Sequence, residues 1–176
     1  VDADALARQA VAPGTAGLRE VADAFGGAVL TPSGELDRAA LRARVFQDEA
    51  ARRRLEAIVH PEVARLRAQA EAEALGGHRR AGTPVVVHDI PLLFETGLEE
   101  EMDAVVLVDA PDAERLRRLV EIRGLDPDEA RRMMAAQQPA AEKRLRTDRV
   151  IDNDGSLEEL ETEARHVWEW IRERAP

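Results

Sequence analysis

Apolar residues between positions 4 and 75 recur every three to four positions, which is the spacing of amphipathic helices. Two such faces come first: Leu6, Ala10 and Val11, and then Leu18, Val21, Ala22 and Phe25. Gly26-Gly27 is expected to end the second helix, and Thr-Pro-Ser-Gly at 31–34 predicts a turn. Three or more helices are therefore predicted before the first strand.

The later helices of this region have recognisable ends. Asp37 can cap a helix that carries Leu41 and Val45 on its apolar face. The next helix is predicted over residues 51–59. It is expected to end at His60-Pro61, because proline disfavours the α conformation of the residue before it.

Two short runs of β-branched residues break the helical pattern, at 84–89 and 104–109. Both are short continuous runs that end in aspartate, the pattern of strands buried on both faces of a parallel sheet. Residues 149–153, Arg-Val-Ile-Asp-Asn, form a weaker third candidate. The alternation of strands with helical segments predicts an α/β fold with parallel strands and right-handed crossovers.

The starts of helices in this second half are also marked. Pro127 and Pro139 are each placed to begin a helix between the last two strands, because the first turn of a helix accommodates proline well. Ser156 and Glu159 have the spacing of a capping box, which predicts reciprocal hydrogen bonds at the start of the final helix.

Composition limits the kinds of protein that this chain can be. With 176 residues, 44% of them hydrophobic and 34% charged, it can bury the core of one globular domain. It has no cysteine for disulfides or zinc, and its four histidines lack metal-ligand spacing, so no resident metal is predicted. No apolar run approaches the roughly 18 residues needed to cross a membrane, and no secretory signal opens the chain. We therefore expect a cytoplasmic protein without a membrane partner.

The net charge of −10 argues against nucleic acid as a partner, because contacts with a phosphate backbone need an excess of Lys and Arg. The charge is unevenly distributed. Residues 115–149 contain ten Lys and Arg but six Asp and Glu, a local charge of +4. Such a basic segment can clamp a compact polyanion such as a nucleotide. It can equally be the solvated face of charged helices, so charge leaves both interpretations open.

Polar residues close the three predicted strands, namely Asp89, Asp109 and Asn153. In open α/β sheets, ligands bind outside the carboxyl ends of the strands, so these side chains mark the expected cleft. Alternatively they cap turns or helices, as Asp and Asn often do. Their positions locate a candidate site without identifying a reaction.

Asp2 and Asp4 stand two residues apart at the start of the chain. If residues 1–2 end a strand, the pair marks a strand-to-helix junction at the same sheet edge. Phosphoryl transfer needs mainly positioning, charge stabilisation and one carboxylate that orients or deprotonates the acceptor hydroxyl, and either aspartate could serve. The alternative is that one of them is the N-cap of the first helix.

Arginines dominate the basic residues of the segment 112–124. Its apolar stripe is predicted to face the core, which leaves Arg115, Arg118 and Arg123 free to face a ligand or solvent. The paired donors of a guanidinium group suit phosphate oxygens. Arg144 flanks a later helix that could close over a nucleotide in the same way.

Six short motifs follow one another along the chain. They are Val-Asp-Ala-Asp at 1–4, Val-Ala-Pro-Gly-Thr at 11–15, Gly-Glu-Leu-Asp-Arg at 34–38, His60-Pro61, Ile-Pro-Leu-Leu-Phe-Glu at 90–95 and Val-Ile-Asp-Asn-Asp-Gly at 150–155. In this order and approximate spacing they resemble the motifs of dephospho-coenzyme A kinases. The resemblance implies a P-loop kinase-like parallel sheet flanked by helices, with a helical acceptor-binding region and a mobile helical lid.

Members of that family transfer the γ-phosphate of ATP to the ribose 3′-hydroxyl of dephospho-coenzyme A, the last step of coenzyme A synthesis. The resemblance therefore implies ATP with Mg²⁺ and dephospho-coenzyme A as the ligands of this chain. It also implies one domain over 1–176 with three parts: an acceptor-binding region at 15–80, a core at 81–114 and 149–176, and a lid at 115–148.

The resemblance assigns roles to individual residues. Asp4 matches the proposed catalytic base on the 3′-hydroxyl, Asp2 the carboxylate beside it, and Arg118 a lid arginine that approaches the transferring phosphate. The acceptor side is matched by Leu92, Leu93, Glu95 and His60. The nucleotide side is matched by Arg115, Arg123 and Arg144 of the lid and by Asn153 and Gly155 of the adenine-side loop.

One motif of the family does not occur: the 176 residues contain no GxxxxGK[ST] phosphate-binding loop. We expect a chain cut short at its N-terminus, without the first strand and the P-loop. We also expect it to be impaired as a kinase, because the amides and lysine of that loop stabilise phosphate charge. One alternative is a non-catalytic module that binds coenzyme A or a protein partner, and another is a related small-molecule kinase with a different acceptor.

Overall fold

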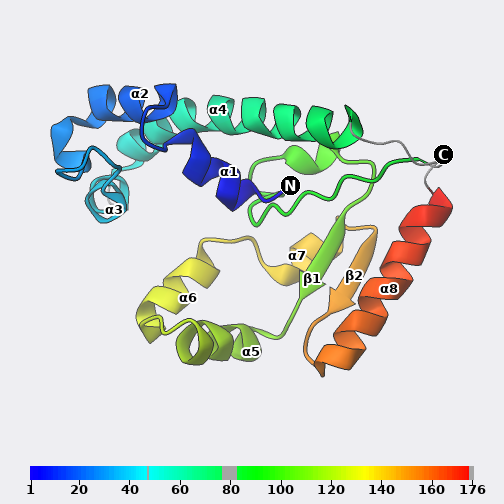
Figure 1. The fold of residues 1–176 in the computed structure, drawn as a ribbon. Coiled ribbons are helices and arrows are strands. Elements are labelled where there is room, and N and C mark those ends of the chain that lie inside the picture. The colour runs from blue at the N-terminus through cyan, green and yellow to red at the C-terminus, as the bar shows by residue number, and fades with distance from the viewer. Residues whose placement is uncertain (47, 77–82, 175–176) are drawn as a thin grey trace. The chain divides into compact units, whose positions relative to one another are not determined.

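Four helices form the first of two compact units, Val1–Pro91 and Leu92–Pro176, into which the protein divides (Figure 1). The computed structural model describes residues 1–46, 48–76 and 83–174. The helices of the first unit are α1 (Ala3–Ala10), α2 (Ala16–Phe25), α3 (Arg38–Phe46) and α4 (Glu49–Gly76), with the 3₁₀ turn η1 (Gly27–Val29) after α2. The three shorter helices all pack along α4.

Side-chain caps fix where the short helices begin. Asp2, Thr15 and Asp37 each accept a hydrogen bond of 2.9 to 3.1 Å from a backbone N–H in the first turn of α1, α2 and α3. Such caps satisfy amides that have no partner within the helix. Helix α2 ends at Gly26, whose φ of 82° is a conformation that favours glycine. The predicted cap at Asp37 and the predicted stop at Gly26-Gly27 are confirmed.

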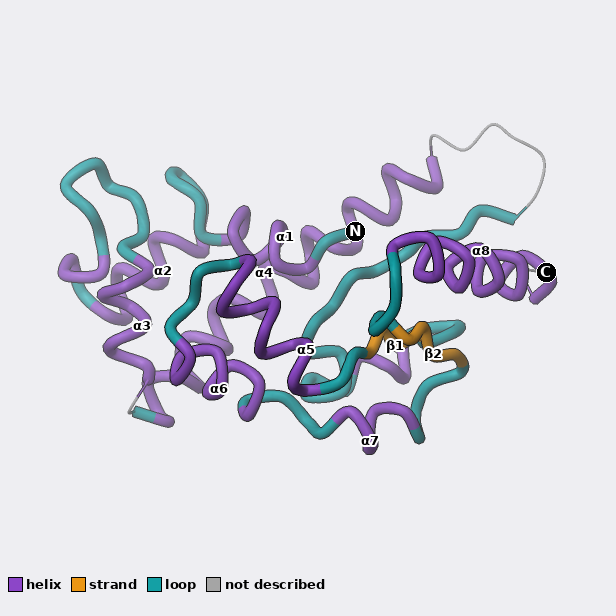
Figure 2. Tube along the Cα trace, turned by 90° about the horizontal axis from the view of Figure 1, so that it is seen from below, coloured by secondary structure: helices purple, strands orange, loops and turns teal. Residues whose placement is uncertain are grey.

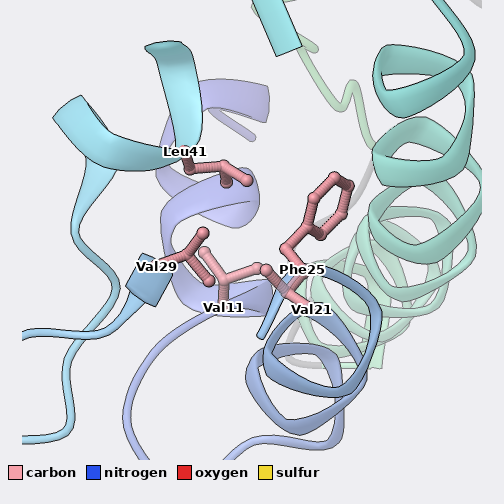
Figure 3. Close-up of a cluster of buried hydrophobic side chains, with 5 residues drawn as sticks. All are labelled: Val11, Val21, Phe25, Val29 and Leu41. Atoms are coloured by element: carbon pink, nitrogen blue, oxygen red, sulfur yellow. The ribbon is translucent and has the colours of Figure 1, made fainter. Parts of the chain in front are cut away.

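The core of the first unit is a cluster of five buried side chains, Val11, Val21, Phe25, Val29 and Leu41 (Figure 3). Val21 and Val29 are completely excluded from solvent. Helix α4 closes the cluster with four partly buried side chains, Ala51, Leu55, Ile58 and Val59. Burying a Val, Leu, Ile or Phe side chain contributes roughly 1.5 to 3 kcal/mol, so this cluster holds the short helices on α4.

Helix α4 continues through Pro61, so the prediction of a helix that ends at His60-Pro61 is wrong. Leu55 and Ile58 pack on the core before the proline, and Leu66 is buried after it. Pro61 itself is exposed, so its ring meets solvent and the helix loses one backbone hydrogen bond. Packing on both sides of Pro61 outweighs this local cost.

The predicted strand over 84–89 is present only as an isolated parallel bridge between Asp2 and Asp89. The N–H of Asp89 donates to the Val1 carbonyl (2.8 Å), and the N–H of Ala3 donates to the Asp89 carbonyl (3.0 Å). Helix α1 begins at Ala3, so this neighbour has too few extended residues to form a ladder. The predicted strand-to-helix junction at residues 1–4 is present.

The second unit contains a two-stranded parallel sheet (Figures 1 and 2). Strands β1 (Val106–Asp109) and β2 (Arg149–Asp152) pair with Val106 opposite Arg149 and Asp109 opposite Asp152. In Figure 2, the final helix α8 (Leu157–Arg174) lies on one side of the strands and the short helix α7 (Ala140–Arg144) on the other. Both strand predictions in this unit are confirmed, and the fold is α/β with a small parallel sheet.

The crossover between the strands is helical throughout most of its length. It comprises α5 (Asp112–Arg117), the π-helical turn η3 (Arg118–Ile122), α6 (Pro127–Ala135) and α7, and a 3₁₀ turn η2 (Leu98–Glu101) precedes β1. Pro127 opens α6 as predicted, whereas Pro139 is the residue before α7. The Ser156 and Glu159 capping box of α8 is confirmed by hydrogen bonds in both directions.

The predicted division into acceptor-binding region, core and lid stays a prediction. Its boundary at residues 80 and 81, and the last two residues of the predicted core, lie outside the described residues. No helix in the described part of the chain is long and apolar enough to span a membrane.

Candidate active site

The first group of candidate residues lies at the start of α1. Asp2 is the N-cap of this helix, as one of the two sequence interpretations proposed, and it bridges Asp89 through the backbone. Asp4 lies in the first turn and is exposed. Among the described residues, no hydrogen bond or ion pair engages the Asp4 carboxylate. The Asp4 carboxylate is therefore available to accept a hydrogen bond from a ligand.

His60 lies in the middle of α4, beside Pro61, and is exposed. The structure brings Asp2, Asp4 and Asp89 together at one end of α1. The remaining candidates belong to the second unit and form three groups there.

The second group stands at the carboxyl ends of β1 and β2, where Arg144 contacts two aspartates. Arg144 Nε donates to Asp109 Oδ2 (2.7 Å), and Arg144 Nη2 contacts Asp152 Oδ1. The hydrogen bonds to Asp109 and then Asp152 raise the pKa of Arg144 above its ordinary value. The backbone N–H of Asn153 donates to the Asp109 carbonyl (2.6 Å). A fixed guanidinium therefore lies at the sheet edge where α/β proteins bind ligands.

Gly155 follows this edge in the loop before α8. A Cβ atom built at Gly155 would lie 2.4 Å from the Glu159 carboxylate, which completes the capping box with Ser156. A side chain here would force the carboxylate of Glu159 to move, so the loop needs glycine if the cap is to remain. Asn153 is partly buried, and Gly155 is exposed.

The third group consists of the arginines on α5 and η3. Arg115 pairs with Asp112 (3.2 Å), and Arg118 Nε donates to Glu114 (2.7 Å). Both arginines were expected to be free for a ligand or solvent, but each forms an ion pair within its own helical segment. Arg123 is exposed, and its N–H closes the π turn on the Arg118 carbonyl (3.1 Å). Single π turns inside helices are frequent at functional sites.

Glu114 is the centre of these helix-surface ion pairs. Its carboxylate accepts hydrogen bonds from both Arg117 and Arg118. The hydrogen bonds from Arg117 and then Arg118 lower the pKa of Glu114 to about 2. Glu114 therefore stays ionised at any physiological pH and orients the two guanidinium groups.

The fourth group is the segment 92–95. Leu92 is 45% exposed, Leu93 is partly buried, and Phe94 beside them is buried. The Glu95 carboxylate points into the protein, because Oε1 accepts from Lys143 Nζ (2.9 Å) and from the backbone N–H of Gln138 (2.7 Å). Leu92 thus offers apolar surface to a ligand, whereas Glu95 is occupied by its own chain.

Sequence reasoning missed Lys143, Glu114 and Asp152 as parts of these groups. Lys143 had the clearest signal, because it is the single lysine among the 25 Lys and Arg residues of the sequence. In the structure its side chain is buried. Glu114 stands three and four residues before two arginines, the spacing of helical ion pairs. Asp152 carries no signal beyond its position near a strand end. Among residues 1–46, 48–76 and 83–174, no cluster of three or more His, Asp or Glu is arranged to hold a metal ion.

The second unit is thus an α/β structure with an arginine at the carboxyl edge of a parallel sheet and an arginine-rich helical crossover, features that suit a phosphorylated ligand. The sequence model of dephospho-CoA kinases matches residues 1–159, and the chain belongs to this family.

Two dephospho-CoA kinases have sequences similar to this chain over most of its length. The dephospho-CoA kinase of Anaeromyxobacter dehalogenans is 52% identical over 160 residues, which cover 91% of this chain and 74% of that protein. The dephospho-CoA kinase of Geobacillus kaustophilus is 49% identical over 90% of this chain and 77% of its own length. Membership of this family supports a kinase function in coenzyme A biosynthesis, with ATP as co-substrate.

Solved structures show the same fold. The crystal structure of TT1252 from Thermus thermophilus matches with a TM-score of 0.80 and 40% identity, and covers 97% of this chain and 83% of that one. The dephospho-CoA kinase from Campylobacter jejuni matches with a TM-score of 0.65 over 98% of this chain and 84% of its own. At 24% identity the second match speaks for the fold alone.

Proposed function

We propose that this protein transfers the γ-phosphoryl group of ATP to the ribose 3′-hydroxyl of dephospho-coenzyme A, with Asp4 as the general base. The observation that carries the proposal is the state of Asp4, which is exposed in the first turn of α1 within a chain of this family. A carboxylate at this place can accept the proton of an acceptor hydroxyl as the phosphoryl group arrives. Asp2 supports it by capping the same helix.

On the nucleotide side, we propose that arginines stabilise the charge of the transferring phosphoryl group. Arg118 would leave part of its pairing with Glu114 to reach a phosphate oxygen, with Arg115 and Arg123 beside it. Arg144 already lies at the carboxyl edge of the sheet, where it donates hydrogen bonds to two aspartates. Phosphoryl transfer is catalysed mainly by positioning and electrostatic stabilisation, and guanidinium groups placed where negative charge develops contribute to that stabilisation.

Other contacts follow from the same proposal. In the second unit, the exposed part of Leu92 together with Leu93 would contact the acceptor, and the loop from Asn153 to Gly155 would contact adenine. In the first unit, His60 is proposed as an acceptor-side residue on the family resemblance alone. Mg²⁺ would arrive with ATP and be held mainly by the phosphates, because Mg²⁺ keeps most of its water and is seldom held in all-protein cages. This fits the described residues, where Asp109 and Asp152 are already engaged by Arg144.

A second candidate function rests on one observation: the 176 residues contain no GxxxxGK[ST] sequence. That loop supplies backbone amides and a lysine to the ATP phosphates. We therefore propose that a protein consisting of residues 1–176 alone phosphorylates dephospho-coenzyme A slowly. A non-catalytic module that binds coenzyme A is the alternative that would also explain the observation.

The decisive experiment is a kinase assay on the complete gene product and on residues 1–176, with ATP, Mg²⁺ and dephospho-coenzyme A. We expect the complete product to convert dephospho-coenzyme A and ATP into coenzyme A and ADP. In that protein, Asp4→Asn should lower kcat by about 10²- to 10⁴-fold, the usual contribution of a general base. The matched control is Asp23→Asn, an exposed aspartate of α2, which should leave kcat unchanged.

Three outcomes would count against parts of the proposal. Full activity of Asp4→Asn would remove Asp4 as the base. Preference for adenosine, gluconate or shikimate in a competition assay would replace the acceptor. Tight binding of dephospho-coenzyme A in calorimetry, without phosphorylation by the complete product, would establish the binding module instead.

A further inference from the structure

The buried ion pair between Glu95 and Lys143 joins two segments that lie far apart in the sequence. The distance from Lys143 Nζ to Glu95 Oε1 is 2.9 Å, and the two side chains are only 8% and 17% exposed. Glu95 belongs to the segment with Leu92 and Leu93, whereas Lys143 belongs to α7, one residue before Arg144. The pair therefore connects the proposed acceptor side of the second unit to its proposed nucleotide side.

Several further contacts reinforce this connection. The backbone N–H of Gln138 donates to Glu95 Oε1 (2.7 Å), at the approach to α7. Just after α7, Arg146 contacts the carboxylate of Glu99, which is 12% exposed, and its guanidinium lies 4.9 Å from the ring centre of Phe94. These contacts add to the Glu95–Lys143 pair in holding the segment 92–99 against residues 138–146.

The electrostatics make the connection strongly dependent on both partners. Burial acts to raise the pKa of Glu95, but the hydrogen bonds from Gln138 and Lys143 outweigh it, and the pKa lies below its ordinary value. Glu95 is therefore ionised at neutral pH. Glu95 Oε2 is buried and, among the described residues, has no hydrogen-bond partner. Removing Lys143 would leave this carboxylate charged, buried and without its cation, which is far more costly than removing both charges together.

We propose that Glu95 and Lys143 are positioning residues that lock α7 onto the segment 92–99, so that Arg144 and the acceptor-side leucines are set as one piece. The proposal rests on the proposed function and refines it, because it gives Glu95 a role through Arg144 and not through contact with the acceptor. A compact ammonium fits this closed site, and the single lysine of the chain occurs here. Arg144 in turn keeps its place through Asp109 and Asp152.

The test combines hydrogen–deuterium exchange with steady-state kinetics on the complete gene product. The variants are Lys143→Met, Glu95→Gln and the double variant, and the matched control is Glu142→Gln, an exposed acid on the same helix. In each single variant, amide exchange should accelerate about tenfold in both 92–99 and 138–146, the two segments that the pair joins. The double variant should exchange more slowly than either single variant, and the control should match the wild type.

The kinetic arm separates positioning from a purely structural role. At a temperature where circular dichroism shows every variant folded, kcat should fall about 10- to 100-fold in the single variants, since a displaced catalytic arginine loses its alignment. The kcat of the double variant should be at least as high as that of the less active single variant. A stability change with kcat within twofold of wild type would overturn the proposal, and so would faster exchange in one segment only. If the wild type phosphorylated nothing, the proposed function would fail, while the exchange data alone would still decide whether the pair holds α7.

Discussion

Replacing Gly17 with alanine tests how closely α1 and α2 are packed. Gly17 is buried, and a Cβ atom there would lie 2.4 Å from the Ala10 carbonyl oxygen and 3.3 Å from its carbonyl carbon. Ordinary contact begins near 3.4 Å, so α2 would have to move by about 1 Å away from α1. Neither atom belongs to a flexible side chain that could turn aside.

Two opposing effects set the sign of the result. A Gly→Ala change inside a helix stabilises it by about 0.8 to 1.0 kcal/mol through backbone entropy. Overpacking of a core costs about 1 to 3 kcal/mol, and a clash of the added methyl group with backbone atoms belongs at the upper end of that range. The free energy of unfolding should therefore fall by about 2 kcal/mol.

Urea denaturation followed by far-UV circular dichroism measures this change. With a denaturant slope of about 2 kcal/mol per molar urea, the midpoint should fall by about 1 M. The control is Gly27→Ala in η1, where no atom lies within 4 Å of the added Cβ, and its midpoint should equal or slightly exceed that of wild type. An unchanged or higher midpoint for Gly17→Ala would show that α1 and α2 are not packed as closely as described.

Two further predictions concern the second unit. The pKa of Glu114 should be about 2 in a carboxyl-carbon NMR titration, lowered from 4.5 by Arg117 and Arg118. Because this pKa is lower in the folded protein, the ionised carboxylate stabilises the fold fully above about pH 4.5. That stabilisation is lost as the pH falls towards 2. Arg118→Lys should raise this pKa, and a wild-type midpoint near 4.5 would mean that the ion pairs do not form in solution. The guanidinium of Arg149 lies 4.6 Å from the Trp170 ring centre. Arg149→Gln should therefore lower the free energy of unfolding by about 0.5 to 1 kcal/mol. Urea denaturation followed by tryptophan fluorescence measures this change, and a midpoint equal to that of wild type would contradict the contact.

Local sequence signals predicted those parts of the fold that local chemistry decides. The cap at Asp37, the stop at Gly26 and the capping box at Ser156 depend on residues within one turn, and all three are present. Pro61 shows the limit of such reasoning. Its helix-breaking tendency is local, whereas the packing of Leu66 and the residues before Pro61 is a tertiary effect that the pattern around the proline does not reveal.

The candidate site divides in the same way. Residue type and spacing indicated that Asp2 or Asp4 caps the first helix, but only the structure distinguishes the cap at Asp2 from the exposed carboxylate of Asp4. Strand-end placement pointed to the sheet edge, yet it gave no sign that Arg144 lies there, because a contact 35 residues away in sequence depends on the crossover. Residues 84–89 form only an isolated bridge and not the predicted strand. Their sequence pattern could not reveal how many extended residues the neighbouring segment supplies for pairing.

The proline inside α4 also bears on how the first unit acquires its order. Isolated helices shorter than about 12 to 15 residues are marginal in water, and α1, α2 and α3 have 8, 10 and 9 residues. Helix α4 is long enough, but Pro61 costs it about 3 kcal/mol when nothing packs against it. Each of these helices is therefore of marginal stability by itself, and they are expected to form together. The location of Asp4 is then a property of all four helices and not of the single turn that carries it.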